Sequence, residues 1–345
     1  MDKNSTYVGL DLSLNEAVAC AMASDGTILQ EWTTSSNAES ITNGLEERGY
    51  ANAIVGFETG LNSGVILREL IVLNINAVCI DARHAHKTLS LRREKTDKID
   101  ARGLAKLISL GWYQPITLRT TEMQMIRAII KARRELESLK RVQLNKIRGL
   151  FHTLGIYRKS TSGRLFIKEA RGIIERETEY RELFVPILRS YDALDEQLQS
   201  YNKYLTRKAA SDDTTSKLMS VPGVGAITAL SFMTAIDHNP RSSKEISSFI
   251  GLCPRVHESG QTKRTRSIGY TGEPILRSLL FIAARSIITV VNVDCELKRW
   301  GTALRERLGF KRAAIAVARK IATILYAIVR NGTSFQPEPS ALPKQ

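Results

Sequence analysis

The chain has 345 residues, of which 43% are hydrophobic and 25% charged, so it can bury a hydrophobic core and is not a disordered protein. Lys and Arg total 50 against 35 Asp and Glu, which gives a formal net charge of +15. This excess favours a polyanionic partner, and nucleic acid is the first candidate because binding to phosphates releases their counterions. The alternative is a generically basic soluble protein.

The sequence predicts a cytoplasmic protein with no membrane partner. The N-terminus lacks the apolar core of a signal peptide, and Lys or Arg interrupts the longest apolar runs, so we expect neither export nor a membrane span. The basic residues are spread along the chain, which argues against an amphipathic membrane anchor. The cysteines show no metal-binding spacing and are expected to be buried reduced thiols; they are Cys20, Cys79, Cys253 and Cys295.

Residues 6–80 are predicted to form an α/β domain with a mixed sheet, because strand patterns come first and then alternate with a helix. The pair Asp25-Gly26 separates two strands and is typical of a β-hairpin. The predicted strands are residues 6–13, 16–23, 27–34, 53–60 and 76–82, and the predicted helix is residues 64–74.

Residues 97–111 are predicted to form the next helix, and Pro115 closes this unit. Asp97 and Asp100 lie at its start, inside a very basic stretch. One explanation is a helix cap, because an Asp at the N-cap followed three residues later by an acidic residue resembles a capping box, and early carboxylates suit the helix dipole. The other is a metal site, since this spacing places both carboxylates on one helix face. Taken alone, the cap is the commoner feature.

The remaining segments are predicted to be mainly helical. Residues 121–208 carry apolar residues at spacings of three and four, with a break near residues 157–163, which predicts an antiparallel helical pair or a coiled-coil arm. A polar linker is predicted at residues 211–216. Two glycines around Val224 then precede an apolar helix, and they fit either a helix-hairpin-helix element that holds a phosphate or an ordinary turn between helices.

Two carboxylates in the N-terminal domain favour the metal site. Asp11 lies within an apolar strand, where burying an unpaired carboxylate is costly, and Glu58 ends another apolar strand. If Asp11, Glu58, Asp97 and Asp100 converge, each pair at ~4 Å repels by roughly 4 kcal/mol, so bound cations are needed. Oxygen ligands suit Mg²⁺ or Mn²⁺, and a pair of such ions can assist phosphodiester chemistry. The same helix start can be both capped and catalytic.

This order of an Asp on the first strand, a Glu on a later strand and two Asp on a following helix resembles the RuvC-like branch of the ribonuclease H fold. From about residue 6 to 333 the chain resembles the DEDD-type insertion-sequence transposases that carry an additional serine, the bridge-RNA-guided recombinases. The motifs that carry the resemblance are "GLDLS", "GFETG", "KTDKIDARGLA", "SVPGVGAITA", "FIGLCPRVHESG" and "SIGYTGEPILRSLL".

The resemblance implies a division of the chain into four parts. Residues 1–116 would form an α/β, ribonuclease H-like (RuvC-like) catalytic domain that binds the metal. Residues 117–211 would form a helical coiled-coil arm, and residues 212–333 a mainly α-helical transposase domain with the catalytic serine. Residues 334–345 are expected to be a disordered tail.

Ser259 stands in a polar, glycine-punctuated stretch and, by residue type alone, would be an ordinary loop residue. If this stretch is an extended strand, His257 and Ser259 point to the same side and Glu258 to the other, so His257 is a candidate assistant. The resemblance places Ser259 at the serine of the family's "ESG" motif. It implies that this serine attacks a DNA phosphate and forms a covalent protein-DNA intermediate, with the metal-bound carboxylates coming from another protomer.

Further partners follow from the resemblance and from the charge. The resemblance implies donor and target DNA, a bridge RNA that sets specificity, and a homo-oligomer, dimer or tetramer, with composite active sites in a bacterial or archaeal cell, associated with the nucleoid. Aromatic residues are only 6% of the chain, so RNA recognition would depend on phosphate and shape. The basic residues expected to face nucleic acid are Arg92, Arg93, Lys95, Lys98, Arg102, Lys263, Arg264 and Arg266.

Two departures and two alternatives qualify this prediction. Family members commonly carry a Lys three residues after the first Asp, where this chain has Leu14, and the segment after Glu58 is shorter than usual. The first alternative is a metal-dependent endonuclease or junction resolvase that uses water in place of Ser259. The second is a nucleic-acid-binding scaffold without catalysis, in which the carboxylates are caps and hydrogen-bond partners.

Overall fold

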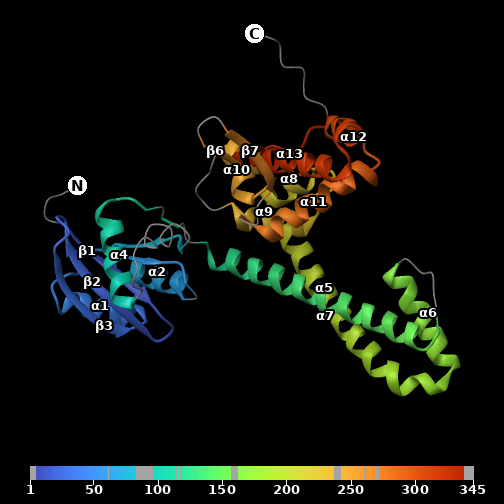
Figure 1. Cartoon of the computed structure of the whole chain (residues 1–345), viewed down its shortest axis with the longest axis horizontal. Helices are drawn as coiled ribbons and strands as arrows, with labels where there is room; N and C mark the ends of the chain where they lie inside the picture. The colour runs from blue at the N-terminus through green and yellow to red at the C-terminus, as the bar shows by residue number, and fades with distance from the viewer. Residues whose placement is uncertain are drawn as a thin grey trace, which may run out of the picture. The chain divides into compact units, whose positions relative to one another are not determined.

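The computed structural model divides into two compact units, residues 1–118 and 119–345, each with its own hydrophobic core (Figure 1). The structure describes residues 5–60, 62–82, 96–113, 115–116, 119–156, 162–236, 242–259, 262–268 and 272–337. Within these ranges, the side chains at 243, 244, 255–259 and 262–267 are outside the description.

The first unit contains the predicted mixed sheet. Its five strands follow the order β3-β2-β1-β4-β5. The pairs β1/β2 and β2/β3 are antiparallel, whereas β1/β4 and β4/β5 are parallel. The strands are β1 (Thr6–Leu12), β2 (Glu16–Ala23), β3 (Ile28–Ser35), β4 (Ile54–Glu58) and β5 (Ala77–Ile80). The sequence pattern thus located every strand of this sheet, and the predicted α/β class is confirmed.

Helices cover both faces of the sheet because its central strands are apolar on both sides. Val8, Leu10, Val55 and Phe57 belong to the core cluster on the face that packs against α1 (Ala38–Glu46) and α2 (Ser63–Val72). On the other face, Tyr7 and the glycines of β1 and β4 pack against α4 (Asp97–Ser109).

Gly9 sets how closely α4 approaches the sheet. A Cβ at this position would lie 2.2 Å from the Ala101 carbonyl oxygen and 2.3 Å from the Ala105 amide nitrogen. Only glycine leaves room for the helix backbone at this distance. The contact fixes α4, and with it the two aspartates of its first turn, directly over β1.

The second unit is helical apart from one hairpin. Its elements are α5 (Thr121–Thr153), α6 (Gly163–Arg176), a 3-10 turn (Thr178–Tyr180), α7 (Arg181–Ser211), α8 (Asp213–Met219), α9 (Ala226–Ala235), α10 (Ser243–Ile250), β6 (Pro254–Ser259), β7 (Thr262–Ile268), α11 (Pro274–Thr289), α12 (Glu296–Leu308) and α13 (Phe310–Asn331). The linker predicted at residues 211–216 is wrong, since α8 begins there and Asp212 caps it through the Thr215 amide.

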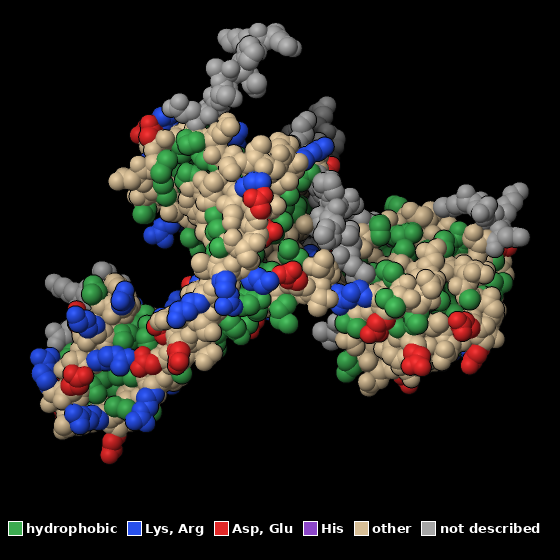
Figure 2. All heavy atoms as spheres, turned by 180° about the vertical axis from the view of Figure 1, so that it is seen from behind, with side chains coloured by type: hydrophobic (Ala, Val, Ile, Leu, Met, Phe, Trp, Pro, Cys, Tyr) green, Lys and Arg blue, Asp and Glu red, His purple; other side chains and the backbone are tan. Residues whose placement is uncertain are grey.

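The predicted antiparallel helical pair is formed by α5 and α7. Lys208 pairs with Glu122, and Lys140 with Asp195, so residue numbers fall along α7 as they rise along α5. The sequence pattern did not predict α6 as a separate helix; its apolar face packs on Phe151 and Phe184 at the far end of the pair. Figure 2 shows Lys and Arg side chains mixed with Asp and Glu over these helices.

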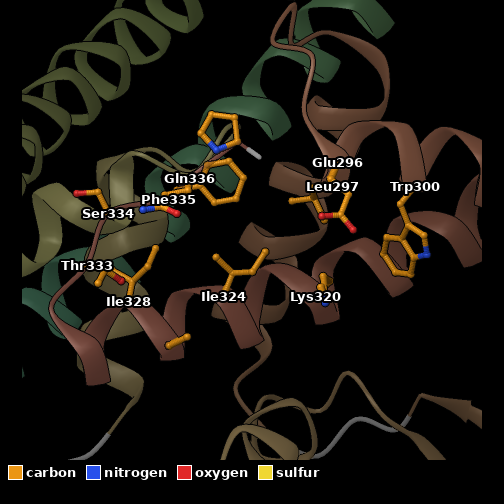
Figure 3. A pocket seen from close by; sticks show the side chains of 12 residues that line it. Glu296, Leu297, Trp300, Lys320, Ile324, Ile328, Thr333, Ser334, Phe335 and Gln336 are labelled. Carbon is orange, nitrogen blue, oxygen red and sulfur yellow. The ribbon is translucent and has the colours of Figure 1, made fainter. Parts of the chain in front are cut away.

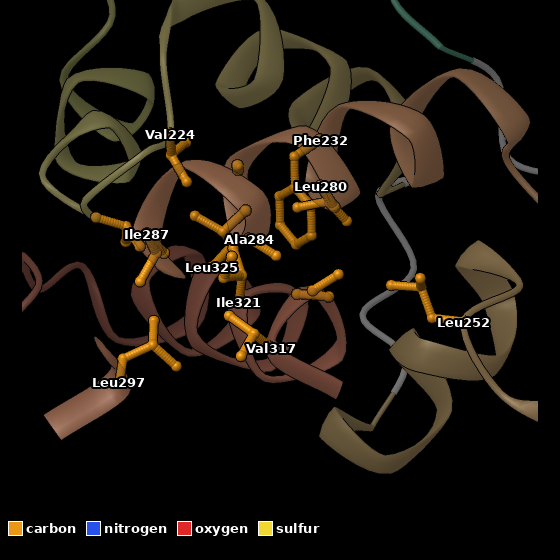
Figure 4. Packing of buried hydrophobic residues seen from close by; sticks show 14 of the residues in the cluster. Val224, Phe232, Leu252, Leu280, Ala284, Ile287, Leu297, Val317, Ile321 and Leu325 are labelled. Carbon is orange, nitrogen blue, oxygen red and sulfur yellow. The ribbon is translucent and has the colours of Figure 1, made fainter. Parts of the chain in front are cut away.

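The core of the second unit lies among α9, α11 and α13. Figure 4 shows Phe232 of α9, Leu280 and Ala284 of α11, and Ile321 and Leu325 of α13 gathered at its centre. Residues 334–337 belong to the segment predicted as a tail, yet Phe335 packs against this core and its amide donates to the Ser220 hydroxyl at 2.8 Å. None of the helices that the structure describes is long and apolar enough to cross a membrane.

Candidate active site

Asp11 and Glu58 lie on neighbouring parallel strands at the same end of the sheet. Leu10 of β1 pairs with Phe57 of β4, so the next residues along the two strands are Asp11 and Glu58. Side chains alternate along a strand, which places both carboxylates on the face that Gly9 and Gly56 present to α4. Both are half-buried.

Helix α4 runs antiparallel to β1 and directs its first turn toward the Asp11 end of the sheet. Tyr7 belongs to the cluster with Leu107 near the C-terminus of α4, whereas Gly9, two residues further along β1, meets Ala101. Asp11 lies another two residues along, at the level of the helix start. Asp100 is half-buried there and Asp97 is exposed.

The helix cap is Thr96, not Asp97 as the capping-box interpretation requires. The Thr96 hydroxyl accepts a hydrogen bond from the Ile99 amide at 3.3 Å, and Asp97 is the first helical residue. Thr96 has the extended backbone of an N-cap residue, which explains why the hydroxyl can reach that amide. The aspartates of the first turn still suit the helix dipole, but neither is needed as the cap.

The four carboxylates share one end of one sheet face without forming a ready metal cluster. Among the residues that the structure describes, no three His, Cys, Asp or Glu side chains come close enough together to hold a metal ion. The donor atoms are all carboxylate oxygens, which suits a hard divalent cation. The four carboxylates therefore fit such an ion in donor type and in location. No three of their side chains converge on a common point in this structure.

A further carboxylate that the sequence reasoning missed lies at this end of the sheet. Asp81 follows β5 directly, and Ile80 before it pairs with Glu58. Burial raises the pKa of Cys79 to about 11, and the charges of Glu58 and Asp81 add to this effect. The sequence signal that could have revealed Asp81 is its place immediately after an apolar strand. Cys20, Cys79 and Cys295 are buried, as expected from the sequence, whereas Cys253 is half-buried.

Arg102 pairs with a carboxylate of its own unit. Its Nε and Nη2 donate to the two carboxylate oxygens of Glu31 on β3 at 2.6 and 2.8 Å. The hydrogen bond from Arg102 lowers the pKa of Glu31. A phosphate contact by Arg102, as predicted from the sequence, would have to compete with Glu31. Lys98 is exposed, and the other predicted residues before α4 lie outside the described residues; these are Arg92, Arg93 and Lys95.

Ser259 lies at the end of a two-stranded hairpin in the second unit. Its backbone ends β6 and pairs with Thr262 at the start of β7. The extended strand that the argument about His257 requires is present, whereas the side chains of both residues are outside the description. The three basic residues predicted here are on β7, also without described side chains; these are Lys263, Arg264 and Arg266.

The glycine pair before α9 has one clear packing role. Gly223 adopts a left-handed φ of +78°, and a Cβ there would lie 2.7 Å from the Ala283 carbonyl oxygen of α11. Close packing against α11 therefore explains Gly223 by itself. Gly225 precedes the helix as its N-cap and has open space where a Cβ would be.

Comparison with known proteins assigns this arrangement to a family. A DEDD-type IS110 transposase model matches residues 8–155, and the model described as "Transposase IS116/IS110/IS902 family" matches residues 215–298. The transposase for insertion sequence element IS1111A from Coxiella burnetii is 30% identical over 257 residues, which cover 71% of this chain and 70% of that protein. The chain belongs to the IS116/IS110/IS902 family of transposases.

Other relatives of this IS116/IS110/IS902 transposase bear related names. The transposase for insertion sequence element IS1328 from Yersinia enterocolitica is 27% identical over 71% of this chain and 75% of its own length. A pilin gene-inverting protein from Moraxella bovis is 33% identical over a shorter stretch, 35% of this chain and 38% of its own length. The first family match spans all four carboxylates and the second spans Ser259.

Proposed function

We propose that the protein is a DNA transposase or recombinase that cuts and rejoins the DNA of an insertion sequence. Its family membership supports this activity, and so do relatives named as transposases and as pilin gene-inverting proteins. The net charge of +15 suits a polyanionic substrate.

The observation that carries the proposal is the placement of the carboxylates. Asp11 and Glu58 are neighbours in register on the face that α4 covers, and the cap role that could have explained Asp97 belongs to Thr96. We assign the first unit to the ribonuclease H-like (RuvC-like) fold, supported by its strand order and by its mixture of parallel and antiparallel pairs.

In this proposal, Asp11, Glu58, Asp97 and Asp100 hold Mg²⁺ or Mn²⁺ together with the DNA phosphate. The ion supplies positive charge that stabilises the phosphate in the transition state. Without it the carboxylates would repel one another by roughly 4 kcal/mol per pair at ~4 Å, so bringing them together requires the ion.

The reaction proposed for Ser259 is a reversible exchange of one phosphate ester for another. The Ser259 oxygen loses its proton and forms a bond to phosphorus, while the bond from phosphorus to a deoxyribose oxygen breaks and that oxygen takes up a proton. Rejoining is the reverse attack by a deoxyribose hydroxyl, which releases Ser259. The covalent phosphoserine ester conserves the broken phosphodiester, so that no external energy source is needed.

We further propose the partners that the family resemblance implies. A bridge RNA would pair with donor and target DNA, so that base pairing reads the sequence and the protein reads shape and phosphate. Residues 117–211 would form an arm that assembles protomers, and residues 212–333 would present Ser259 to carboxylates of another protomer. The division of the chain near residue 118 supports separate roles for the carboxylate and serine parts.

The direct test is strand exchange on the junction DNA of the element with co-purified RNA and Mg²⁺. Wild type should recombine, and Asp11→Asn or removal of Mg²⁺ with EDTA should abolish the product. The matched control is Asp25→Asn, the same change in the β2–β3 hairpin, where Asp25 accepts from the Thr27 amide and an amide oxygen can do the same. Cleavage without rejoining would indicate a nuclease that uses water; binding without cleavage would indicate a scaffold.

A further inference from the structure

A second polar site lies within the helical unit, and neither the four carboxylates nor Ser259 is among its lining residues. A cavity of about 310 Å³ opens among α5, α9 and the start of α11. Its volume is at the lower end of the range for ligand pockets. The polar and charged residues that line it without carrying negative charge are Arg119, Gln124, Arg127, Lys131, Ser231 and Thr234.

The charge of this cavity is positive. Arg119, Arg127 and Lys131 face a single carboxylate among the described lining residues, that of Glu273. The Arg127 Nη2 atom lies 2.8 and 3.0 Å from the two Glu273 oxygens, so this pair cancels its own charge. Among the described lining residues, the three cationic side chains thus outnumber the one carboxylate by two.

The surrounding contacts hold the cationic groups in place. The Arg119 Nε atom donates to the Thr234 carbonyl oxygen at 2.8 Å, which ties the residue before α5 to the end of α9. Ser231 and Thr234 are almost completely buried, and the Thr234 hydroxyl donates to the Ser231 carbonyl oxygen. Lys131 is exposed at the rim. Hydrogen bonds therefore hold Arg119 and Thr234 in place, whereas the exposed Lys131 presents its amino group on a flexible side chain.

Another cavity in the same unit lacks the excess of positive charge found beside Arg127. The space of about 540 Å³ between α12, α13 and residues 333–337 is lined mainly by apolar groups, and Figure 3 shows Leu297, Ile324, Ile328 and Phe335 around it. That cavity suits an apolar group, and nothing in the structure indicates which one. The cavity beside Arg127 suits an anion.

We propose that the cavity among α5, α9 and α11 binds one phosphate group of a nucleic-acid strand. This inference rests on the proposed function and adds an anchoring site on the helical unit that includes neither the four carboxylates nor Ser259. The Arg127 guanidinium holds the Glu273 carboxylate through one nitrogen, Nη2, so its other N–H groups can donate to phosphate oxygens. A volume near 310 Å³ admits a phosphate with an attached sugar and excludes a duplex.

Glu273 is the group with which the phosphate competes. Because its carboxylate neutralises Arg127, a strand must either displace it or bind beside it next to Arg119 and Lys131. Removing the negative charge of Glu273 should therefore strengthen binding, and removing the positive charge of Lys131 should weaken it. If either substitution merely disrupted the structure, binding would weaken. Stronger binding on loss of the Glu273 charge together with weaker binding on loss of the Lys131 charge therefore identifies a binding site.

The test measures the affinity of the full-length protein for a fluorescein-labelled 20-nucleotide single-stranded DNA and for an RNA of the same sequence, by anisotropy between 50 and 200 mM salt. Lys131→Gln should weaken binding by about three- to ten-fold and reduce the salt slope by about one. Glu273→Gln should strengthen binding by about three-fold or more. The probe, DNA or RNA, for which Lys131→Gln weakens binding and Glu273→Gln strengthens it identifies the type of strand.

The matched control is Lys203→Gln. Lys203 is an exposed lysine of α7 at the level of Lys131, since its neighbour Asn202 accepts from Arg133 at 2.6 Å, but it lines neither cavity. Its affinity should stay within about two-fold of wild type. If Lys131→Gln and Glu273→Gln also stay at wild-type affinity while wild type binds, the phosphate site is wrong. If wild type binds neither DNA nor RNA, the proposed function itself fails.

Discussion

At the scale of single residues, the start of α4 assigns the helix cap and the proposed metal ligand to different residues. The sequence allowed Asp97 to be both. Thr96 and Asp97 are adjacent, and both residue types are common N-caps. The sequence therefore predicted a cap at this place, but the capping-box interpretation assigned it to Asp97 and was wrong about the residue. The structure assigns it to Thr96, so the two aspartates that follow are available for other contacts.

Substitutions in this turn should divide into two classes. Thr96→Ala should lower the free energy of unfolding by about 1 kcal/mol because the Ile99 amide loses its acceptor, and it should leave strand exchange measurable. Asp97→Asn and Asp100→Asn should abolish strand exchange with little change in the melting temperature. Thermal unfolding by circular dichroism and a recombination assay measure the two properties. Aspartate variants that melt earlier but still recombine would return Asp97 and Asp100 to a structural role.

At the scale of elements, the fit between β1 and α4 determines where the carboxylates lie. The strands were predictable because their apolar runs are bounded by turn residues, and Asp11 and Glu58 were conspicuous within them. The distance of α4 from the sheet was not predictable, because it depends on the absence of a side chain at Gly9 and Gly56. A glycine within a strand signals close backbone approach but does not name the partner.

These two glycines should respond differently to alanine. At Gly9 the added Cβ meets backbone atoms of Ala101 and Ala105 at 2.2 and 2.3 Å, and neither can move without shifting α4. At Gly56 it meets side-chain atoms and no backbone, Ile108 Cδ1 at 2.2 Å and Cγ1 at 2.7 Å, which can shift without moving α4. Gly9→Ala should cost about 3 kcal/mol or more and Gly56→Ala about 1 kcal/mol, measured by urea unfolding. Equal losses would show that α4 is not held by backbone contact at Gly9.

The helical pair α5–α7 offers a test by pH. The hydrogen bond from Lys140 holds the pKa of Asp195 below its ordinary value, against the effect of burial. A carboxylate with a depressed pKa stabilises the fold above its unfolded pKa, and this contribution disappears as pH falls through the folded value. Asp195→Asn should therefore lower stability by about 0.5 kcal/mol at pH 7 and by much less below pH ~4.

Urea unfolding of Asp195→Asn at the two pH values measures this difference. Glu196→Gln is the matched control, because Glu196 is the exposed neighbour of Asp195 on α7 and should change stability at neither pH. A deficit of Asp195→Asn that persists unchanged at pH 3 would mean that packing, and not the charge on Asp195, is responsible.

Some elements escaped prediction for identifiable reasons. Helix α6 follows a polar break, and its apolar residues fit the longer helical pattern of residues 121–208. Phe166 and Ile173 pack against residues from the end of α5 and the start of α7. The hairpin β6–β7 consists largely of polar and basic residues, so it lacks the apolar alternation that marks a strand. The contacts that define α6 come from other helices, whereas β6 and β7 are neighbours in sequence and pair with each other.

At the scale of the whole molecule, the proposed chemistry joins residues of two separate units. The carboxylates belong to residues 1–118, and Ser259 belongs to residues 119–345. Both sets are proposed from short sequence motifs, whereas the proposed assembly that would bring them together involves other protomers and nucleic acid. The central claim is therefore that Ser259 becomes covalently attached to DNA.

That claim is tested by trapping the attachment. Full-length protein is incubated with junction DNA, co-purified RNA and Mg²⁺, and DNA bound to denatured protein is detected on a gel. Wild type should give the adduct, and so should Ser248→Ala, a control at an exposed serine of α10. Ser259→Ala should give none while still binding DNA. An undiminished adduct with Ser259→Ala would contradict the account.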